Sequence, residues 1–143
     1  MPSDVVLILG GGPAGLEAAR GVADLGSRAI LVEPRDRLGG MPDAAQYAAL
    51  THGMRSAEEA MAEMTAAVRG HANVELRLSS TLAGFTGSAG DFTATLAGPK
   101  GAQDVPVGAV IVATGFQHFD PGRETQMYGY YEYDDVITLT DAE

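Results

Sequence analysis

The sequence predicts an α/β fold in which a parallel sheet is combined with helices and a β-meander. Three observations support this prediction. Short β-branched and aliphatic runs at 5–9 and 110–113 each end at or near glycine, as buried parallel strands do. A helical pattern separates the first run from another apolar run at 28–33. Between 81 and 107 the pattern changes to short alternating segments at 82–85, 92–96 and 105–107 that are broken by glycines, which is typical of a meander.

The N-terminal part of the chain predicts a strand, a helix and a second strand. The apolar run Val5–Leu9 stops at glycine, and the helix expected over 13–25 has Pro13 in its first turn and Gly26 after its last. The second strand is expected at 28–33. Two parallel strands joined by a helix form a βαβ unit.

The middle of the chain is expected to add a loop, a helix and a third parallel strand. Prolines and glycines in 34–55 indicate a loop, with a short helix around Ala44–Leu50. Ser56-Ala57-Glu58-Glu59 has the spacing of a capping box, and the helix that follows ends near Gly70. With a third strand at 74–78, the parallel strands are expected in the spatial order 3-2-1-4.

The segment 119–143 is expected to form a tail that is distinct from a domain at 1–118. It is rich in tyrosine and aspartate, and it closes on Thr138–Glu143, which resembles the start of a helix. Its tyrosines allow two interpretations, a surface that binds a partner or a tail packed over the sheet. These tyrosines are Tyr128, Tyr130, Tyr131 and Tyr133.

Composition limits what the chain does alone. The net charge of −10 disfavours nucleic-acid binding, because the phosphates would be repelled, and it favours solubility over attraction to a basic partner. The absence of cysteine excludes disulfides, catalytic thiols and cysteine-ligated iron–sulfur clusters. The apolar run Val5–Leu9 is too short for a signal peptide or a membrane span, so a cytoplasmic location is expected.

The glycine-rich segment Gly10–Gly15 predicts a dinucleotide-binding loop. It contains the pattern GxGxxG between a buried strand and a helix. In this pattern the first glycine, Gly10, makes the tight turn, and Gly12 lets the backbone approach a pyrophosphate. The third, Gly15, permits close packing of helix and strand. The start of the helix then offers free N–H groups and a partial positive charge to the phosphates.

Glu33 completes this pattern from the end of the second strand, eighteen residues after Gly15. Its carboxylate is expected to accept hydrogen bonds from the hydroxyls of the adenosine ribose and to repel a 2′-phosphate, which disfavours NADP. Arg35 and Arg37 are expected to be solvated or to face the pyrophosphate. These patterns alone do not separate FAD from NAD.

A family resemblance favours FAD. The motifs GGGPAG, Leu38-Gly39-Gly40-Met41 and Ala113-Thr114-Gly115-Phe116 resemble those of the FAD half of two-dinucleotide-binding flavoproteins of the disulfide-reductase type. The resemblance covers about residues 4–118. It implies a Rossmann-like FAD/NAD(P)-binding domain, with the Gly-Gly segment along the ribityl-pyrophosphate, the Ala-Thr-Gly turn beside the FAD, and backbone contacts from Leu82 to the adenine. The expected FAD-binding residues are Gly10, Gly11, Gly12, Pro13, Ala14, Gly15, Glu33, Pro34, Arg35, Gly39, Gly40, Met41, Leu82, Ala113, Thr114 and Gly115.

A narrower resemblance comes from the tail. The segments Phe119-Asp120-Pro121, Tyr128-Gly129-Tyr130 and Val136-Ile137-Thr138 are similar to those of the A subunit of heterodisulfide reductases and its sulfur-metabolism relatives. It implies an FAD-carrying electron-transfer subunit whose partners are other electron-transfer subunits, iron–sulfur proteins or a second copy of the chain. Archaeal members carry cluster-ligating cysteines that this sequence lacks.

The same family continues with an NAD(P)-binding domain and a final strand that are missing from this sequence. We therefore expect a fragment of a larger protein, or a second polypeptide that completes the site. Without the last strand, the strand Val110–Ala113 would have an unpaired edge, and FAD binding would be weakened. The isolated chain is expected to be inactive.

The remaining polar residues predict neither a catalytic nor a metal site. His52, His71 and His118 do not have the spacing of metal ligands. His118 follows the Ala-Thr-Gly turn and could approach a flavin, although an ordinary loop histidine is the favoured interpretation. Two other functions stay open, an NAD-binding module without flavin and a non-catalytic assembly subunit.

Overall fold

A four-stranded parallel sheet forms the centre of the computed structural model, which describes residues 3–50, 53, 55–123 and 127–142. Its strands lie in the order β5-β2-β1-β9, and every neighbouring pair is parallel. The bounds are β1 (Val5–Leu9), β2 (Arg28–Val32), β5 (Val74–Arg77) and β9 (Ala109–Val112). This order confirms the predicted arrangement and the α/β class.

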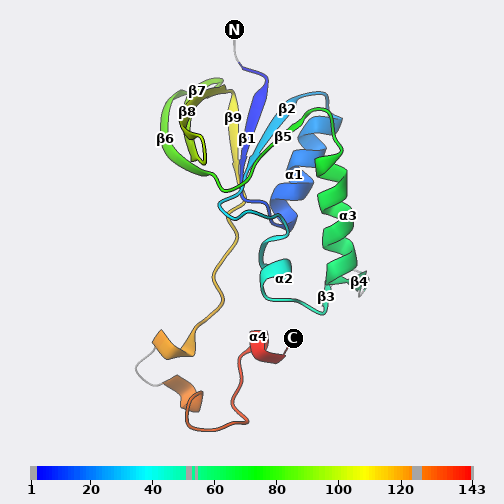
Figure 1. Cartoon of the computed structure of the whole chain (residues 1–143), viewed down its shortest axis with the longest axis vertical. Helices are drawn as coiled ribbons and strands as arrows, with labels where there is room; N and C mark the ends of the chain where they lie inside the picture. Colours follow the sequence, from blue (N-terminus) through cyan, green and yellow to red (C-terminus); the bar gives the residue numbers. More distant parts are fainter. Residues whose placement is uncertain (1–2, 51–52, 54, 124–126, 143) are drawn as a thin grey trace.

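Two layers cover the sheet, one on each face (Figure 1). On one face lie the helices α1 (Pro13–Asp24) and α3 (Ala57–Arg69). On the other face lies the antiparallel meander of β6 (Thr81–Ser88), β7 (Asp91–Gly98) and β8 (Gly101–Val107). The fold is therefore the predicted combination of a parallel sheet, helices and a meander.

Burial on both faces explains why the central strands are continuously apolar. Successive side chains of a strand point to opposite faces. Leu7 of β1 and Ile30 of β2 pack with the meander, whereas Ile8 and Leu31 pack with the helices. All four are at most 2% exposed, so a polar residue at any of these four positions would be buried without a partner.

The two long helices begin where the sequence predicts. Pro13 is the first residue of α1, where its missing N–H costs nothing. Ser56 caps α3, because its Oγ accepts a hydrogen bond of 3.4 Å from the amide of Glu59. Helix α3 ends at Arg69, next to the expected stop at Gly70.

The prediction of a short helix around Ala44–Leu50 is wrong. The helix α2 lies earlier, at Gly40–Ala44, and β3 (Ala49–Leu50) pairs antiparallel with β4 (Arg55–Ser56). The chain leaves the helical conformation at Gln46, whose φ of +53° is incompatible with a right-handed helix. His52 lies outside the described residues.

The meander strands are longer than predicted. The alternating pattern predicts strands at 82–85, 92–96 and 105–107, with the glycines between them as breaks. Gly87 instead lies inside β6 and pairs with Phe92 of β7. This position needs glycine, because the backbone of Asp91 lies so close that a Cβ would stand 2.3 Å from its carbonyl oxygen.

The C-terminal segment runs away from the sheet and forms a small lobe of its own (Figure 1). It contains the short elements η2 (Pro121–Arg123), η3 (Met127–Gly129) and α4 (Leu139–Ala142). The tail therefore does not pack over the sheet, and Tyr128, Tyr131 and Tyr133 are each about two-thirds exposed. Within the described ranges, no helix has both the length and the apolar content that crossing a bilayer requires.

Candidate functional site

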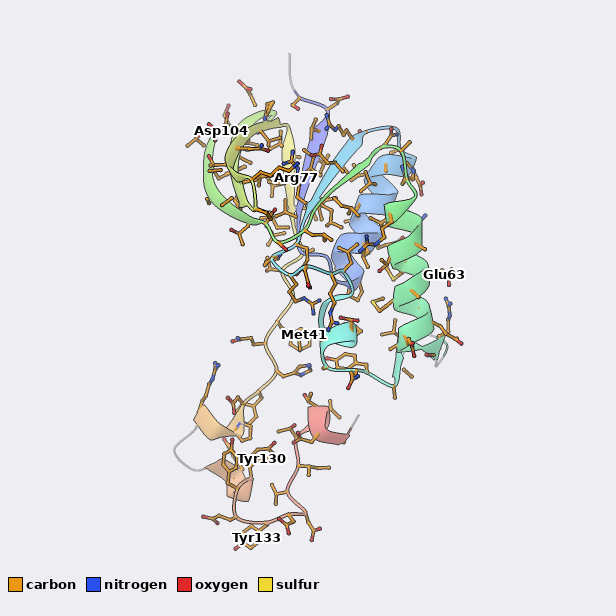
Figure 2. The ribbon with its side chains drawn as sticks, viewed as in Figure 1. Met41, Glu63, Arg77, Asp104, Tyr130 and Tyr133 are labelled. Atoms are coloured by element: carbon orange, nitrogen blue, oxygen red, sulfur yellow. The ribbon has the colours of Figure 1, made fainter. Side chains whose placement is uncertain are left out.

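A cleft of about 640 Å³ lies at the carboxyl ends of the parallel strands. It is formed by the ends of β1, β2 and β9, the starts of α1 and α2, and the entry to β6. All the expected FAD-binding residues line it except Gly15 and Gly39, and Figure 2 shows Met41 at the start of α2. The cleft has the size of a cofactor site and lies where ligands bind in open α/β sheets.

The loop Gly10–Gly15, called the phosphate loop below, requires glycine at two positions for its shape. Gly10 has φ of +110°, and a Cβ there would stand 2.3 Å from the carbonyl oxygen of Ala113. A Cβ on Gly15 would stand 1.8 Å from the carbonyl oxygen of Gly10. Gly15 therefore lies behind the loop, where it lets α1 pack against the end of β1.

Gly12 differs from these two because it faces the cleft. Its φ of −82° is open to any residue, and a Cβ would meet nothing closer than the Cα of Gly40 at 3.5 Å. The amide hydrogens of Gly12 and Ala14 have no acceptor within the part of the chain that the structure describes. They belong to the first turn of α1, whose dipole adds positive potential. This arrangement can bind a diphosphate.

Glu33 lies beside the phosphate loop, only 6% exposed, directly after β2. Its Oε2 accepts a hydrogen bond of 2.7 Å from the amide of Gly11. Its Oε1 accepts one of 3.0 Å from the amide of Arg35 and a longer one of 3.4 Å from Arg35 Nε. Because a carboxylate offers about four acceptor positions, Glu33 can still accept a hydrogen bond from a hydroxyl group in the cleft.

The two arginines that follow Glu33 have different surroundings. Arg35 lines the cleft and donates a hydrogen bond of 3.1 Å to the carbonyl oxygen of Gly40, so it ties the end of β2 to the start of α2. Arg37 is 62% exposed and pairs with Asp43 at 3.0 Å. Arg37 therefore lies outside the cleft, as a surface residue.

The cleft also contains residues that the sequence analysis missed. Ser80 is buried and donates a hydrogen bond of 2.9 Å to the carbonyl oxygen of Leu78. Tyr47 comes from a segment with no secondary-structure pattern, so its sequence gave no signal of a site, whereas Phe116 belongs to the Ala-Thr-Gly-Phe motif but was not among the expected binding residues. The predictions of Leu82 and the Ala-Thr-Gly turn identified the correct parts of the chain but not the adjacent lining residues Ser80, Thr81 and Phe116. The missed residues are Leu9, Val32, Pro42, Ala44, Tyr47, Ser80, Thr81 and Phe116.

Outside the cleft, several charged groups form ion pairs at the surface, such as Glu75 with Arg77 and Arg28. Burial raises the pKa of Glu75 on β5, but hydrogen bonds from Arg77 and Arg28 outweigh this effect, and the net pKa is lowered. A search of the described residues for three or more histidine, aspartate or glutamate side chains arranged around one metal ion finds no such group.

Comparison with solved structures shows the same fold in larger proteins. An L-proline dehydrogenase from P. horikoshii is 24% identical with a TM-score of 0.65, and the match covers 78% of this chain and 22% of that one. Aklavinone-11 hydroxylase, solved with FAD and aklavinone, is 21% identical with a TM-score of 0.58, covering 73% and 31%. A thioredoxin reductase from Streptococcus pyogenes is 16% identical with a TM-score of 0.55, covering 78% and 31%. The chain thus spans less than a third of each of these proteins.

Sequence comparison identifies the family. No curated protein matches the chain significantly. The family model of the pyridine nucleotide-disulphide oxidoreductases, in contrast, matches residues 3–143, which is nearly the whole chain. Together with the α/β fold and the glycine loop beside Glu33, this match shows that the chain belongs to the pyridine nucleotide-disulphide oxidoreductase family.

Proposed function

We propose that the chain forms the FAD-binding part of a flavin-dependent oxidoreductase. One observation carries this proposal, the buried carboxylate of Glu33 held 2.7 Å from the amide of Gly11, next to a helix start with unpaired amides. The amides suit a diphosphate, and the carboxylate suits the ribose hydroxyls. The two groups of an adenosine diphosphate would thus be bound by adjacent parts of one loop.

The residues of the cleft fit FAD along its length. The amides of Gly12 and Ala14 would bind the diphosphate, while Glu33 would bind the adenosine ribose. Gly40 and Met41 would lie along the ribityl chain, and Ala113–Gly115 would lie beside the ring system. When bound, FAD supplies the redox chemistry at its flavin ring, and the protein positions and shields it.

FAD is favoured over NAD by two considerations. Gly40 and Met41 of the Gly-Gly-Met motif and the whole Ala-Thr-Gly motif line the same cleft as the phosphate loop, in keeping with their resemblance to the FAD half of the disulfide reductases. One protein of the same fold, aklavinone-11 hydroxylase, was solved with FAD. An NAD-binding module without flavin and a non-catalytic assembly subunit are the outcomes that the experiment below distinguishes.

A more specific role follows from the tail. Its resemblance to the A subunit of heterodisulfide reductases supports an electron-transfer subunit of a sulfur-metabolism complex. Because these 143 residues contain no cysteine, they cannot ligate an iron–sulfur cluster through thiolates, and any such cluster would be held elsewhere in the complex. Electrons would then pass between a nicotinamide or protein donor and a sulfur-linked or iron–sulfur acceptor.

The exposed part of the tail would serve as the docking surface for such a partner. Tyr128, Tyr131 and Tyr133 are 64–68% exposed, and tyrosine is enriched in protein interfaces. Glu132, Asp134 and Asp135 are interspersed with these rings and are also exposed. A partner with a basic surface would be attracted to this combination. Lysine substitution of the three acids should weaken such a complex.

The test is the identity of the nucleotide that the protein binds. We expect the chain to take up FAD, with flavin absorbance after gel filtration and a raised melting temperature on addition of FAD. Co-purification of NAD without flavin would support the NAD-binding module. If neither nucleotide is bound and neither raises the melting temperature, the chain is an assembly subunit. The variant Gly12→Ala, discussed below, is the matched control for site-specific binding.

A further inference from the structure

Three aromatic side chains gather at one end of the cleft, and we call Tyr47, Phe116 and His118 the aromatic clasp. Tyr47 comes from the connection between α2 and β3, and the other two come from the extended segment after β9. The His118 ring lies 5.7 Å from the ring of Tyr47 and 5.2 Å from that of Phe116, edge to face in both cases. Tyr47 and Phe116 line the cleft.

A hydrogen bond fixes the clasp. The hydroxyl oxygen of Tyr47 and Nε2 of His118 are 2.6 Å apart, and the tautomer of the histidine decides which group donates. The amide of Tyr47 also donates a bond of 3.0 Å to the carbonyl oxygen of Pro42 in α2. Two segments 71 residues apart in the sequence are thereby joined at the mouth of the cleft.

The strand order decides which part of a dinucleotide would reach the clasp. Glu33 follows β2 on one side of the phosphate loop, and Phe116 follows β9 on the other side, because β1 lies between β2 and β9. A ligand with its ribose on Glu33 and its diphosphate on the start of α1 must extend its second half toward β9. On this path the second half would approach Tyr47 and Phe116, which line the cleft.

We propose that the aromatic clasp binds the planar ring system at the end of the dinucleotide that is not adenine. Phe116 is 65% exposed without a ligand, and a flat ring would cover its face. Tyr47 would contact the ring of the ligand from the α2 side. His118 would keep the side chains of Tyr47 and Phe116 in place. This proposal rests on the proposed FAD site and assigns it three residues outside the phosphate loop.

The test compares FAD with ADP, which carries the same adenosine and diphosphate but no flavin. Calorimetric titration of the full chain should show tighter binding of FAD than of ADP. Phe116→Ala and Tyr47→Ala should each weaken FAD binding about tenfold, the upper range for one aromatic contact, and leave ADP binding unchanged. The fluorescence of bound flavin should rise in both variants, because a quenching ring is removed. Tyr47→Phe should lose less affinity than Tyr47→Ala.

Controls separate this proposal from the proposed function. Phe85→Ala removes an exposed aromatic ring from β6, outside the cleft, and should change neither affinity. Because Phe116 is exposed, its truncation should leave the fold intact, which circular dichroism checks. Equal affinities of the wild-type chain for FAD and ADP, or equal losses of both ligands in Phe116→Ala, would overturn the clasp while leaving a dinucleotide site. Failure of the wild-type chain to bind either ligand would overturn both proposals.

Discussion

Individual glycines of the phosphate loop serve different purposes, and the space around each one shows which. At Gly10 and Gly15 a Cβ would collide with backbone at 2.3 and 1.8 Å, so these glycines maintain the loop itself. Gly12 lines the cleft, and a Cβ there would make only an ordinary contact, at 3.5 Å with the Cα of Gly40. A substitution at Gly12 can therefore separate ligand binding from folding.

We predict that Gly12→Ala leaves the melting temperature of the free chain within about 2 °C of wild type, because its stability should change by less than about 0.5 kcal/mol. Affinity for FAD and ADP should fall at least about tenfold, since the added methyl group occupies the space through which a diphosphate approaches the amides. Melting curves and titration calorimetry measure the two effects.

The matched control is Gly21→Ala in the middle of α1, where a Cβ meets nothing within 4 Å. It should stabilise the chain by about 0.5–1 kcal/mol, because alanine is the better helix former, and leave ligand binding unchanged. Similar binding by the Gly12→Ala variant and wild type would contradict a diphosphate at this position.

Glu33→Gln tests the carboxylate beside the loop. The amide group of glutamine places a donor against either the Gly11 or the Arg35 amide, both of which now donate to Glu33. We expect ADP affinity to fall about 10–100-fold, the range for loss of a hydrogen bond to a charged group. Glu17→Gln, on the exposed side of α1, should bind ADP as wild type does.

At the scale of elements, much of the fold could be predicted from local pattern. Strands buried on both faces are continuously apolar, and the α1 and α3 starts carry Pro13 and Ser56. The helix α2 was misplaced because the positive φ of Gln46 depends on tertiary packing, which residue type does not report. The clasp was not predictable, since Tyr47 and His118 meet only after the sheet has formed.

The short helix α4 shows how local pattern and electrostatics combine. Thr138 caps it, with its Oγ accepting a hydrogen bond of 3.2 Å from the amide of Asp141. In return, the Asp141 carboxylate accepts bonds from the Thr138 amide at 2.9 Å and from the Tyr130 hydroxyl at 2.8 Å. Figure 2 places Tyr130 in this lobe, and the predicted helix start at Thr138 is confirmed.

This reciprocal cap predicts a dependence on pH. The Thr138 amide, with the hydroxyls of Tyr130 and Thr138, lowers the pKa of Asp141 from its ordinary value of 3.8. A lowered pKa in the folded state means that the cap is fully present above pH 3.8 and is lost as the pH falls through the lowered pKa. NMR titration of the Asp141 carboxyl should show this shift. Asp141→Asn should remove the change in the chemical shift of the Thr138 amide as the pH falls through the pKa of Asp141, and an unshifted pKa would contradict the cap.

At the scale of the whole molecule, the sheet ends in an open edge. Strand β9 pairs with β1 on one side and with no described strand on the other, and Val112 is 70% exposed. An exposed apolar edge strand is a template for pairing with another strand. The sequence predicted this edge correctly at Val110–Ala113, although the strand itself is Ala109–Val112.

We predict that the isolated chain self-associates through β9 as its concentration rises. Val112→Lys should shift the protein toward the monomer, because a charged side chain at an edge opposes pairing. Leu25→Lys is the control, since Leu25 is 88% exposed but follows α1, away from that edge. Sedimentation velocity over a range of concentrations measures the shift. If Leu25→Lys dissociates the chain as effectively, association does not proceed through β9.

The close approach of Gly10 to the carbonyl group of Ala113 has a consequence for synthesis on the ribosome. The residues of the phosphate loop are translated early, whereas Ala113, which Gly10 contacts, is translated about a hundred residues later. Until β9 emerges and docks beside β1, the turn at Gly10 lacks its close contact with Ala113. A nascent chain should therefore be unable to bind its nucleotide until β9 has emerged and joined the sheet, so cofactor loading would report the docking of β9.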